Sequence, residues 1–525
     1  MTENPLGYEK ISKLLKNFAV PSIVASLVGS IYNIVDQIFI GQGVGYLGNA
    51  ATNVAYPFST ICLAIALLVG IGSASRVSLC LGRKEPKAAA KAAGNGIVLM
   101  GIFGIIYLLV GETFLSLLLK AFGATTDVFP YAKQYASITL IGMPFLIVTN
   151  GMCNLIRADG KPKYSMVCMV VGAIINTILD PIFIFVCDWG IAGGAWATVI
   201  GQIFSFILAL RYLWRFQTIH FEKESFLLDI KESLKICSMG ISSSSNQIAV
   251  TVIQIIQYNS LTYYGALTKY GTDIPLAACG IVMKTNAIIL AIVVGISQGT
   301  QPIIGFNYGA GQYHRVREAY MLAVKWNLVV STIAFIAFQF FPQSIISLFG
   351  DGDELYFEFA VLFMRTYLFM VLVNGVQLLS SSFFTAIGKS LRGALLALTR
   401  QTFFLIPLTL LLPLRFGIMG VLLAGPIADF SAFVLSIVLV GTELRKQKMQ
   451  HILVHSKMNG LRPLLTAPPV FAFRQLRGNF HDLHKRLPGT YRVYLSRLLQ
   501  SRYPQRQLHS AADMEQETQK RRVSV

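Results

Sequence analysis

Residues 95–119 read NGIVLMGIFGIIYLLVGETFLSLLL, a run of 25 residues in which Glu112 is the one charged side chain. About 20 apolar residues in a helix span the hydrocarbon core of a bilayer, so this run is predicted to cross a membrane. Similar runs follow one another from about residue 18 to residue 441. The sequence therefore predicts an all-α polytopic membrane protein.

The composition agrees with this prediction. Of the 525 residues, 54% are hydrophobic and 13% are charged, and the mean hydropathy is +0.60. Soluble globular domains carry roughly 25% charged residues. These values exclude a soluble enzyme, a fibrous protein and a disulfide scaffold. We expect twelve transmembrane helices, at residues 18–40, 53–75, 95–119, 131–155, 164–187, 191–213, 237–261, 276–300, 319–341, 357–382, 393–414 and 418–441.

Positive charge in the connections predicts the orientation. Twenty-two Lys and Arg residues, among them Lys389, Arg392 and Arg400, fall on the side that holds the N-terminus, against five on the other side. Short cytoplasmic connections are enriched in Lys and Arg. We therefore expect a multi-pass protein of the cell membrane with both termini in the cytoplasm.

The chain also repeats itself. Phe122-Gly123 recurs as Phe349-Gly350, and the Gly-Ile-x-Gly segment at Gly190 recurs at Gly417, each 227 residues later. Each half then holds six spans and enters the membrane in the same direction, which is a parallel repeat typical of transporters. We expect two pseudo-symmetric six-helix bundles with the substrate path between them.

The predicted domains follow from these spans. They are an N-terminus at 1–17, an N-lobe at 18–213, a linker at 214–236, a C-lobe at 237–441 and a basic tail at 442–525. The tail from residue 443 holds +11 of the net charge of +19. We expect it to be cytoplasmic and partly disordered, or else to bind anionic lipid.

Two carboxylates interrupt the apolar spans of the N-lobe. Asp36 lies four residues after Tyr32, and Asp180 lies four residues after Asn176, so each pair shares a helix face. Thr198 adds a hydroxyl at a comparable depth. Two carboxylates in a low-dielectric site do not both stay ionised unless a cation lies between them. The pattern favours a coupling site for H⁺ or Na⁺ over simple interhelical hydrogen bonding.

Prolines accompany both carboxylates. Pro21 lies in the span of Asp36, and Pro181 follows Asp180 directly. A proline within a span frees a carbonyl oxygen that a polar cavity can satisfy. We expect both prolines to bend their helices.

The C-lobe does not copy this pair, because the repeat places Pro407 where the N-lobe has Asp180. Asp429 is either a second cation site or a structural partner, and Lys284 either faces the cavity or extends to the outer interface. A polar stripe in the seventh span predicts a cavity wall or polar helix packing. It consists of Gln247, Thr251, Gln254 and Tyr258.

Several motifs together resemble the multidrug and toxic compound extrusion (MATE) family over residues 8–442. Pro21 precedes Asp36 by fifteen residues, and this spacing resembles that of the family. The other motifs are Ile34-Val35-Asp36-Gln37-Ile38-Phe39-Ile40-Gly41, Arg157-Ala158-Asp159-Gly160-Lys161-Pro162, Asn176-x-x-x-Asp180-Pro181 and Gln301-Pro302-Ile303-Ile304-Gly305-Phe306-Asn307-Tyr308-Gly309-Ala310.

The resemblance implies a V of two six-helix lobes that exports amphipathic, often cationic compounds against inward H⁺ or Na⁺. In one branch of the family an N-lobe cluster couples the ion. Carried over by match, this cluster is Asp36, Tyr32, Asn176, Asp180, Thr198 and Asn154, and Na⁺ would bind at Asp36 and Asp180.

Other functions fit the sequence less well. The chain lacks a phosphate-binding loop and a zinc-protease motif, so we expect a monomeric transporter rather than an enzyme, with no cofactor and no nucleic-acid partner. The alternative is a flippase for lipid-linked oligosaccharides or peptidoglycan precursors, which would need several basic residues in its cavity for pyrophosphate.

Overall fold

Helices make up almost the whole of the computed structural model in residues 4–348 and 353–466, the part of the chain that the structure describes. This follows from the apolar spans, because a helix satisfies its own backbone N–H and C=O groups where water is absent. Of the described residues, those up to Gly441 form one compact unit, and residues 442–466 belong to a second one. Most of the expected tail, residues 467–525, lies outside the described residues.

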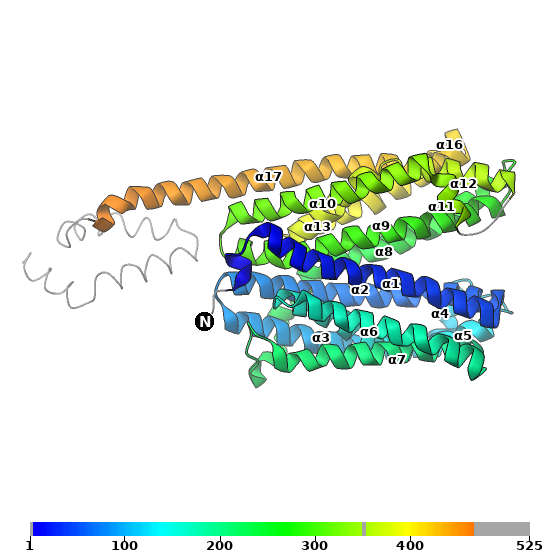
Figure 1. Cartoon of the computed structure of the whole chain (residues 1–525), viewed down its shortest axis with the longest axis horizontal. Coiled ribbons are helices and arrows are strands. Elements are labelled where there is room, and N and C mark those ends of the chain that lie inside the picture. Colours follow the sequence, from blue (N-terminus) through cyan, green and yellow to red (C-terminus); the bar gives the residue numbers. More distant parts are fainter. Residues whose placement is uncertain (1–3, 349–352, 467–525) are drawn as a thin grey trace, which may run out of the picture. The chain divides into compact units, whose positions relative to one another are not determined.

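The first unit begins with the helices of the N-lobe. They lie in one group in Figure 1, coloured blue to teal. They are η1 (Pro5–Gly7), α1 (Ile11–Val44), α2 (Tyr46–Gly82), α3 (Pro86–Thr113), α4 (Leu115–Ala121), α5 (Phe129–Ala158), α6 (Pro162–Pro181), the π-helical turn η2 (Ile182–Val186) and α7 (Gly190–Arg211). The linker contains η3 (Tyr212–Arg215) and η4 (Lys223–Phe226). It comprises residues 212–229 instead of the predicted 214–236, because α8 already begins at Ile230.

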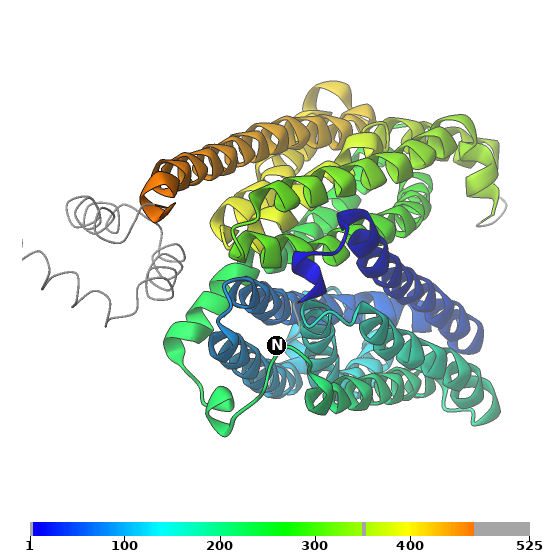
Figure 2. The same ribbon diagram turned by 60° about the vertical axis from the view of Figure 1, so that its left-hand side comes forward.

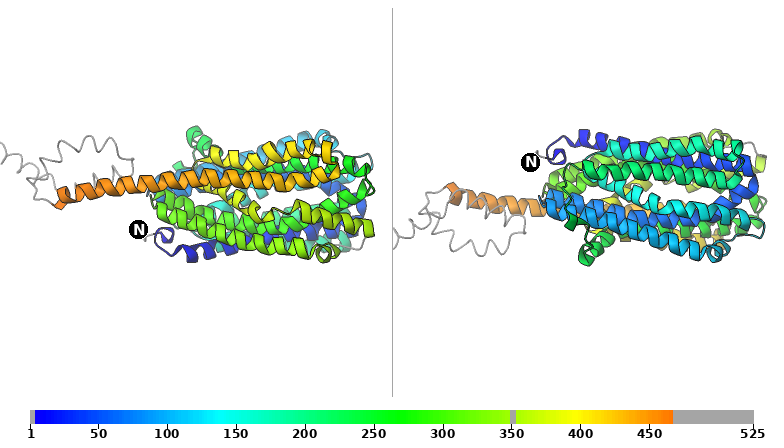
Figure 3. Two further views of the ribbon diagram at one scale, coloured as in Figure 1. Left: turned by 90° about the horizontal axis from the view of Figure 1, so that it is seen from above. Right: turned by 90° about the horizontal axis from the view of Figure 1, so that it is seen from below.

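The C-lobe forms the second group, coloured green to orange, and Figure 3 shows that the long helices of both lobes run along a common direction. Its helices are α8 (Ile230–Ala266), α9 (Asp273–Gly309), α10 (Tyr313–Phe340), α11 (Pro342–Ser347), α12 (Glu354–Tyr367), α13 (Val371–Ala386), α14 (Ser390–Leu398), the π-helical turn η5 (Thr399–Leu405), α15 (Ile406–Leu411), α16 (Pro413–Phe416) and α17 (Ile418–Thr466).

Twelve spans account for the described helices. Ten are long and apolar enough to cross a membrane, and α12 with α13, bent by 48°, make an eleventh. Helix α8 is the twelfth, and at 37 residues it is long enough, although its polar stripe keeps it outside that apolar set. The fold is thus the predicted one, with helices that extend beyond the expected bounds. Helix α1, for example, begins at Ile11 instead of residue 18.

The two lobes touch most closely at the end where the linker joins them, which we call the linker end. There α2 packs on α8, and α1 packs on α9 (Figure 2). Glycines allow this contact: a Cβ on Gly240 would overlap the backbone carbonyl of Leu68, and a Cβ on Gly72 would overlap that of Ile236. The helices at the linker end therefore meet backbone to backbone.

This contact predicts the effect of one added methyl group. Gly240→Ala should lower the free energy of unfolding by about 1–3 kcal/mol, because α2 and α8 have to separate. Gly280→Ala on α9 is the matched control, since a Cβ there meets nothing within 4 Å. It should be neutral or stabilising, because alanine favours a helix. Thermal unfolding of the purified variants in detergent measures both, and equal midpoints would contradict this packing.

Candidate functional site

A cavity of about 640 Å³ lies between the lobes. Its N-lobe wall comes from α1, α2, α5, α6 and α7, and its C-lobe wall comes from α8, α9, α12 and η5. The lining residues sit in the middle of these helices and toward the end opposite the linker end. Contact at one end and a cavity toward the other make the V that the family resemblance implies.

The two predicted carboxyl groups meet at the N-lobe wall, where Asp36 lines the cavity and Asp180 lies outside the cavity lining. Asp36 is 8% exposed and Asp180 is fully buried, and their side chains interact directly. The Asn176 amide donates hydrogen bonds to Asp180 Oδ1 at 3.2 Å and to Thr198 Oγ1 at 3.3 Å. Tyr32 lies beside both carboxyl groups. Five of the six predicted coupling residues therefore form one cluster.

Tyr135 belongs to the same cluster, although no motif or spacing in the sequence indicates it. It lies on α5, lines the cavity, and is an electrostatic neighbour of Asp36, Asp180 and Tyr32. No local spacing links it to these residues, since the contact depends on how α5 packs in the lobe.

Asn154, the sixth predicted residue, lies outside the cavity lining. Its Oδ1 accepts a hydrogen bond of 2.7 Å from the Arg157 guanidinium, and its amide donates to the Asn150 carbonyl at 2.9 Å. Asn150, one turn earlier on α5, lines the cavity instead. The structure thus does not bring Asn154 to the carboxyl pair.

The two prolines have different local settings. Pro181 ends α6 immediately before the π-helical turn η2, so the backbone irregularity directly follows Asp180. Pro21 is buried inside α1, which is helical from Ile11 to Val44. It lies about 22 Å along the helix from Asp36, at 1.5 Å per residue.

The C-lobe wall contains part of the predicted polar stripe. Gln247 and Gln254 line the cavity, and the Thr251 hydroxyl donates back to the Gln247 carbonyl at 3.3 Å. Tyr258 is 37% exposed and does not line the cavity. The Lys284 side chain is exposed and also lies outside the lining.

Asp429 forms an ion pair with Arg400, and this contact corrects the sequence analysis. Arg400 does not lie in a connection; it lies in η5 and lines the cavity. Without it, the charge count of the connections becomes 21 against five, so the asymmetry remains. Arg400 lies within the expected span 393–414, so it does not belong among the residues of the connections.

Comparison with known proteins identifies the family. The MatE family model matches residues 21–182 and 249–411, one segment in each lobe. The chain belongs to the MatE family. It is 25% identical over 423 residues to the multidrug export protein MepA of Staphylococcus aureus strain N315, a match that covers 80% of this chain and 91% of MepA.

Two further comparisons agree. The probable multidrug resistance protein YoeA of Bacillus subtilis strain 168 is 23% identical over 394 residues, which are 73% of this chain and 84% of YoeA. The solved outward-facing conformation of a multidrug resistance MATE family transporter matches with a TM-score of 0.80 at 19% identity. That match covers 86% of this chain and 99% of the other, and it shows that the fold is shared.

The N-lobe cluster of this MatE protein holds three buried oxygen atoms without a hydrogen-bond donor. They are Asp36 Oδ1, Asp180 Oδ2 and Asn176 Oδ1. Buried acceptors normally have a partner. The described residues contain no group of three His, Cys, Asp or Glu side chains that could hold a metal ion. Two carboxylates, an amide oxygen and nearby hydroxyls instead match the oxygen ligands that a proton or a hard monovalent cation takes.

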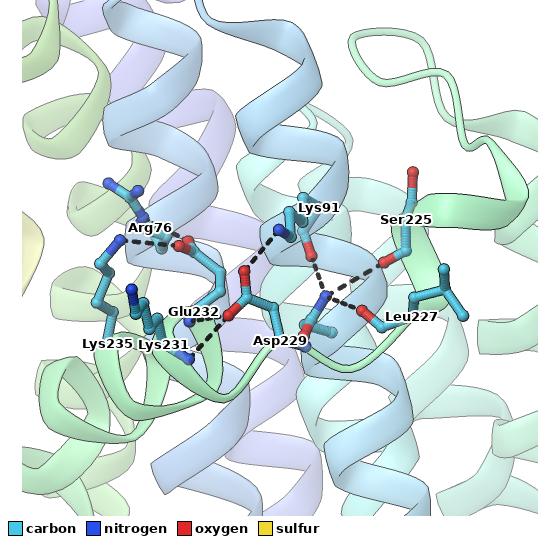
Figure 4. A network of polar contacts seen from close by, with 9 residues as sticks. Arg76, Lys91, Ser225, Leu227, Asp229, Lys231, Glu232 and Lys235 are labelled. Carbon is cyan, nitrogen blue, oxygen red and sulfur yellow. Dashed lines mark hydrogen bonds and ion pairs between the residues drawn. The ribbon is translucent and has the colours of Figure 1, made fainter.

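A polar network fixes the linker to the N-lobe at the linker end (Figure 4). The fully buried Asn95 amide on α3 donates to the carbonyls of Ser225 and Leu227, and its Oδ1 accepts the Asp229 N–H at 2.8 Å. Asp229 also caps α8, and the hydrogen bond from Lys91 holds the pKa of Asp229 below its ordinary value.

An ion pair extends this network to α2. The Arg76 Nε lies 2.7 Å from Glu232 Oε1, and Lys235 Nζ lies 3.2 Å from Glu232 Oε2. Arg76 belongs to the N-lobe and Glu232 to the C-lobe. The network thus joins the two lobes where they are already in contact.

The buried amide should matter more than the exposed ion pair beside it. Asn95→Ala should lower the free energy of unfolding by about 2 kcal/mol, because it leaves buried backbone groups of the linker without partners. Lys91→Ala, one turn away on α3, removes an exposed ion pair and should lower the free energy of unfolding much less, because exposed ion pairs contribute little to stability. Thermal unfolding in detergent compares the two variants, and a larger loss for Lys91→Ala would contradict this reading.

Proposed function

We propose that this protein is a secondary active exporter that exchanges H⁺ or Na⁺ for amphipathic, cationic small molecules. The observation that carries the proposal is the set of three buried acceptor oxygens on Asp36, Asp180 and Asn176 without donors. A bound cation would supply the partner that these oxygen atoms lack. Ion coupling requires a site at which a cation binds reversibly. The names of MepA and YoeA supply the multidrug substrate class for the proposal.

The cycle follows from the electrostatics of the carboxyl pair. Without a cation, Asp36 and Asp180 attract a cationic substrate into the cavity. Entry of H⁺ or Na⁺ neutralises the pair and removes that attraction, so the substrate leaves. Release of the ion on the other side restores the charge. Bending of α1 at Pro21 would narrow the cavity during the exchange.

The orientation of the cycle rests on the charge of the connections. With the linker end in the cytoplasm, both termini are cytoplasmic, and the cavity lies toward the outside of the cell membrane. The ion then enters from outside, down its gradient, and the substrate leaves in the opposite direction. We propose that a single chain performs this cycle, because both walls of the cavity come from one chain.

Both candidate ions suit the cluster in chemical terms. A proton can be shared between two adjacent carboxyl groups. Sodium would take oxygen ligands from Asp36, Asp180 and Asn176, with the Tyr32 and Thr198 hydroxyls nearby. Which ion drives export is therefore decided by the response to each gradient.

A flippase for pyrophosphate-linked lipids is the weaker candidate. Pyrophosphate binding calls for several uncompensated cationic side chains. In the described part of the chain, the cavity lining contains Arg400 alone among Lys and Arg residues, which is too few for a pyrophosphate site.

Export assays with carboxyl variants test the proposal. Asp36→Asn and Asp180→Asn should each reduce efflux of ethidium to the level of cells without the protein, because neither variant can exchange a cation for the substrate. Efflux by the wild type should stop when one gradient, of H⁺ or of Na⁺, is collapsed. That gradient then names the ion.

The control is Asp188→Asn, which removes an exposed carboxylate outside the cavity and should retain wild-type efflux. Immunodetection in isolated membranes verifies equal expression of all variants. Normal, gradient-dependent efflux by Asp36→Asn would overturn the proposal.

A further inference from the structure

Arg400 holds a defined position on the C-lobe wall. Arg400 and Gln401 are consecutive residues of the π-helical turn η5 and both line the cavity, and π-helical turns often occur at functional sites. The Arg400 side chain is 15% exposed, and its Nε donates to Asp429 Oδ1. Asp429 is 5% exposed and does not line the cavity itself. Arg400 thus stands between the cavity and its own counterion.

The ion pair explains how a guanidinium is tolerated at this depth. A buried charge without a partner is strongly destabilising, and Asp429 removes that penalty. Asp429 accepts from Nε, which is one of five N–H donors on the planar guanidinium. A guanidinium can therefore bind a second carboxylate along its other edge while it keeps the first.

Buried amides around the cavity have unused hydrogen-bonding capacity. Gln257 Nε2, Gln401 Oε1 and Asn286 Oδ1 have no partner, although these side chains are 3%, 5% and 7% exposed. All three residues line the same cavity as Arg400. The Tyr367 hydroxyl donates to Gln257 Oε1 at 3.3 Å, which leaves the Gln257 amide N–H groups unused.

The unpartnered amide atoms of Gln257, Gln401 and Asn286 indicate a binding site. Buried polar atoms without partners are uncommon in folded proteins, and a ligand that supplies the missing partner gains binding energy from them. Tyr367 is also an electrostatic neighbour of both Arg400 and Asp429, so the amide and the ion pair belong to one cluster. The C-lobe wall therefore presents donors from a cation and from an amide to the same cavity.

We propose that this C-lobe cluster binds the carboxylate of a zwitterionic substrate, with Arg400 and Gln257 as its donors. The opposite wall carries Asp36 and attracts the cationic group of the same molecule. Gln401 and Asn286 accept hydrogen bonds from substrate N–H or O–H groups. This inference rests on the proposed export function and narrows its substrate class from cations to molecules that carry both charges.

A matched pair of dyes tests the site directly. One is a rhodamine with a free carboxylate on its phenyl ring, and the other is its methyl ester, which is a plain cation with the same chromophore. Fluorescence anisotropy with the purified full-length protein in detergent gives the two dissociation constants. Wild type should bind the carboxylate form about tenfold more tightly than the ester, since a charge-assisted hydrogen bond contributes about this factor.

Variants then locate the source of that preference. Arg400→Gln combined with Asp429→Asn removes both charges together, so that no buried charge is left unpaired, and the affinity ratio should fall to about one. Gln257→Ala keeps the ion pair, and it should reduce the ratio about threefold. Lys284→Gln removes an exposed cation of α9 outside the cavity and should keep the wild-type ratio.

The export function and the carboxylate site fail in different ways. Asp36→Asn should weaken binding of both dyes by the same factor, because both are cationic at the xanthene, and it should keep the ratio. If cells with the wild-type protein export neither dye, but the purified protein still prefers the carboxylate form, the proposed export function is rejected and the carboxylate site stands. A wild-type ratio near one, or a ratio that the double variant leaves unchanged, would overturn the carboxylate site.

Discussion

A charged side chain in a membrane protein interior needs a counterion, and the two lobes meet this constraint in different ways. In the C-lobe, Asp429 has a permanent partner in Arg400. In the N-lobe, Asp36 meets a second carboxylate, Asp180, whose remaining oxygen has no donor. Asp429 is neutralised within the protein, whereas a cation from solution would neutralise the pair of Asp36 and Asp180. This difference between the two halves of the repeat is our reason to propose that the coupling ion binds in the N-lobe.

The packing at the linker end gives the cavity its direction. Helices α2 and α8 meet there at the glycines Gly72 and Gly240, where a side chain would not fit. The Asn95 network and the Arg76–Glu232 pair add polar contacts at the same end. The proposed alternating-access cycle would require these contacts to open together, and close backbone packing favours either a closed or an open contact over intermediate positions. In that cycle the cavity would face one side of the membrane at a time.

The sequence predicts the spans and the N-lobe cluster well, because both depend on local spacing. Apolar runs set the helices, and a separation of four residues puts Asn176 beside Asp180 on α6. Tyr135 is not predictable from the sequence, because its contact with the cluster depends on the packing of α5 against the other helices. Arg400 is wrongly assigned to a connection because it lies near the cytoplasmic end of the expected span 393–414, and a count of positive charges does not show that its side chain lines the cavity. Asn154 lies one turn from Asn150, which the cavity includes, and a family motif alone does not resolve that difference.

In the proposed cycle, substrate and coupling ion compete through the carboxyl pair of Asp36 and Asp180. The most direct test measures the apparent dissociation constant of ethidium for the purified protein as a function of pH and, separately, of Na⁺ concentration at constant ionic strength. We predict that it rises with the concentration of one of these ions, with a logarithmic slope near one, and that the slope vanishes when Asp36 and Asp180 are both replaced by asparagine. Binding that responds to neither ion, or a slope that survives this double replacement, would contradict the account.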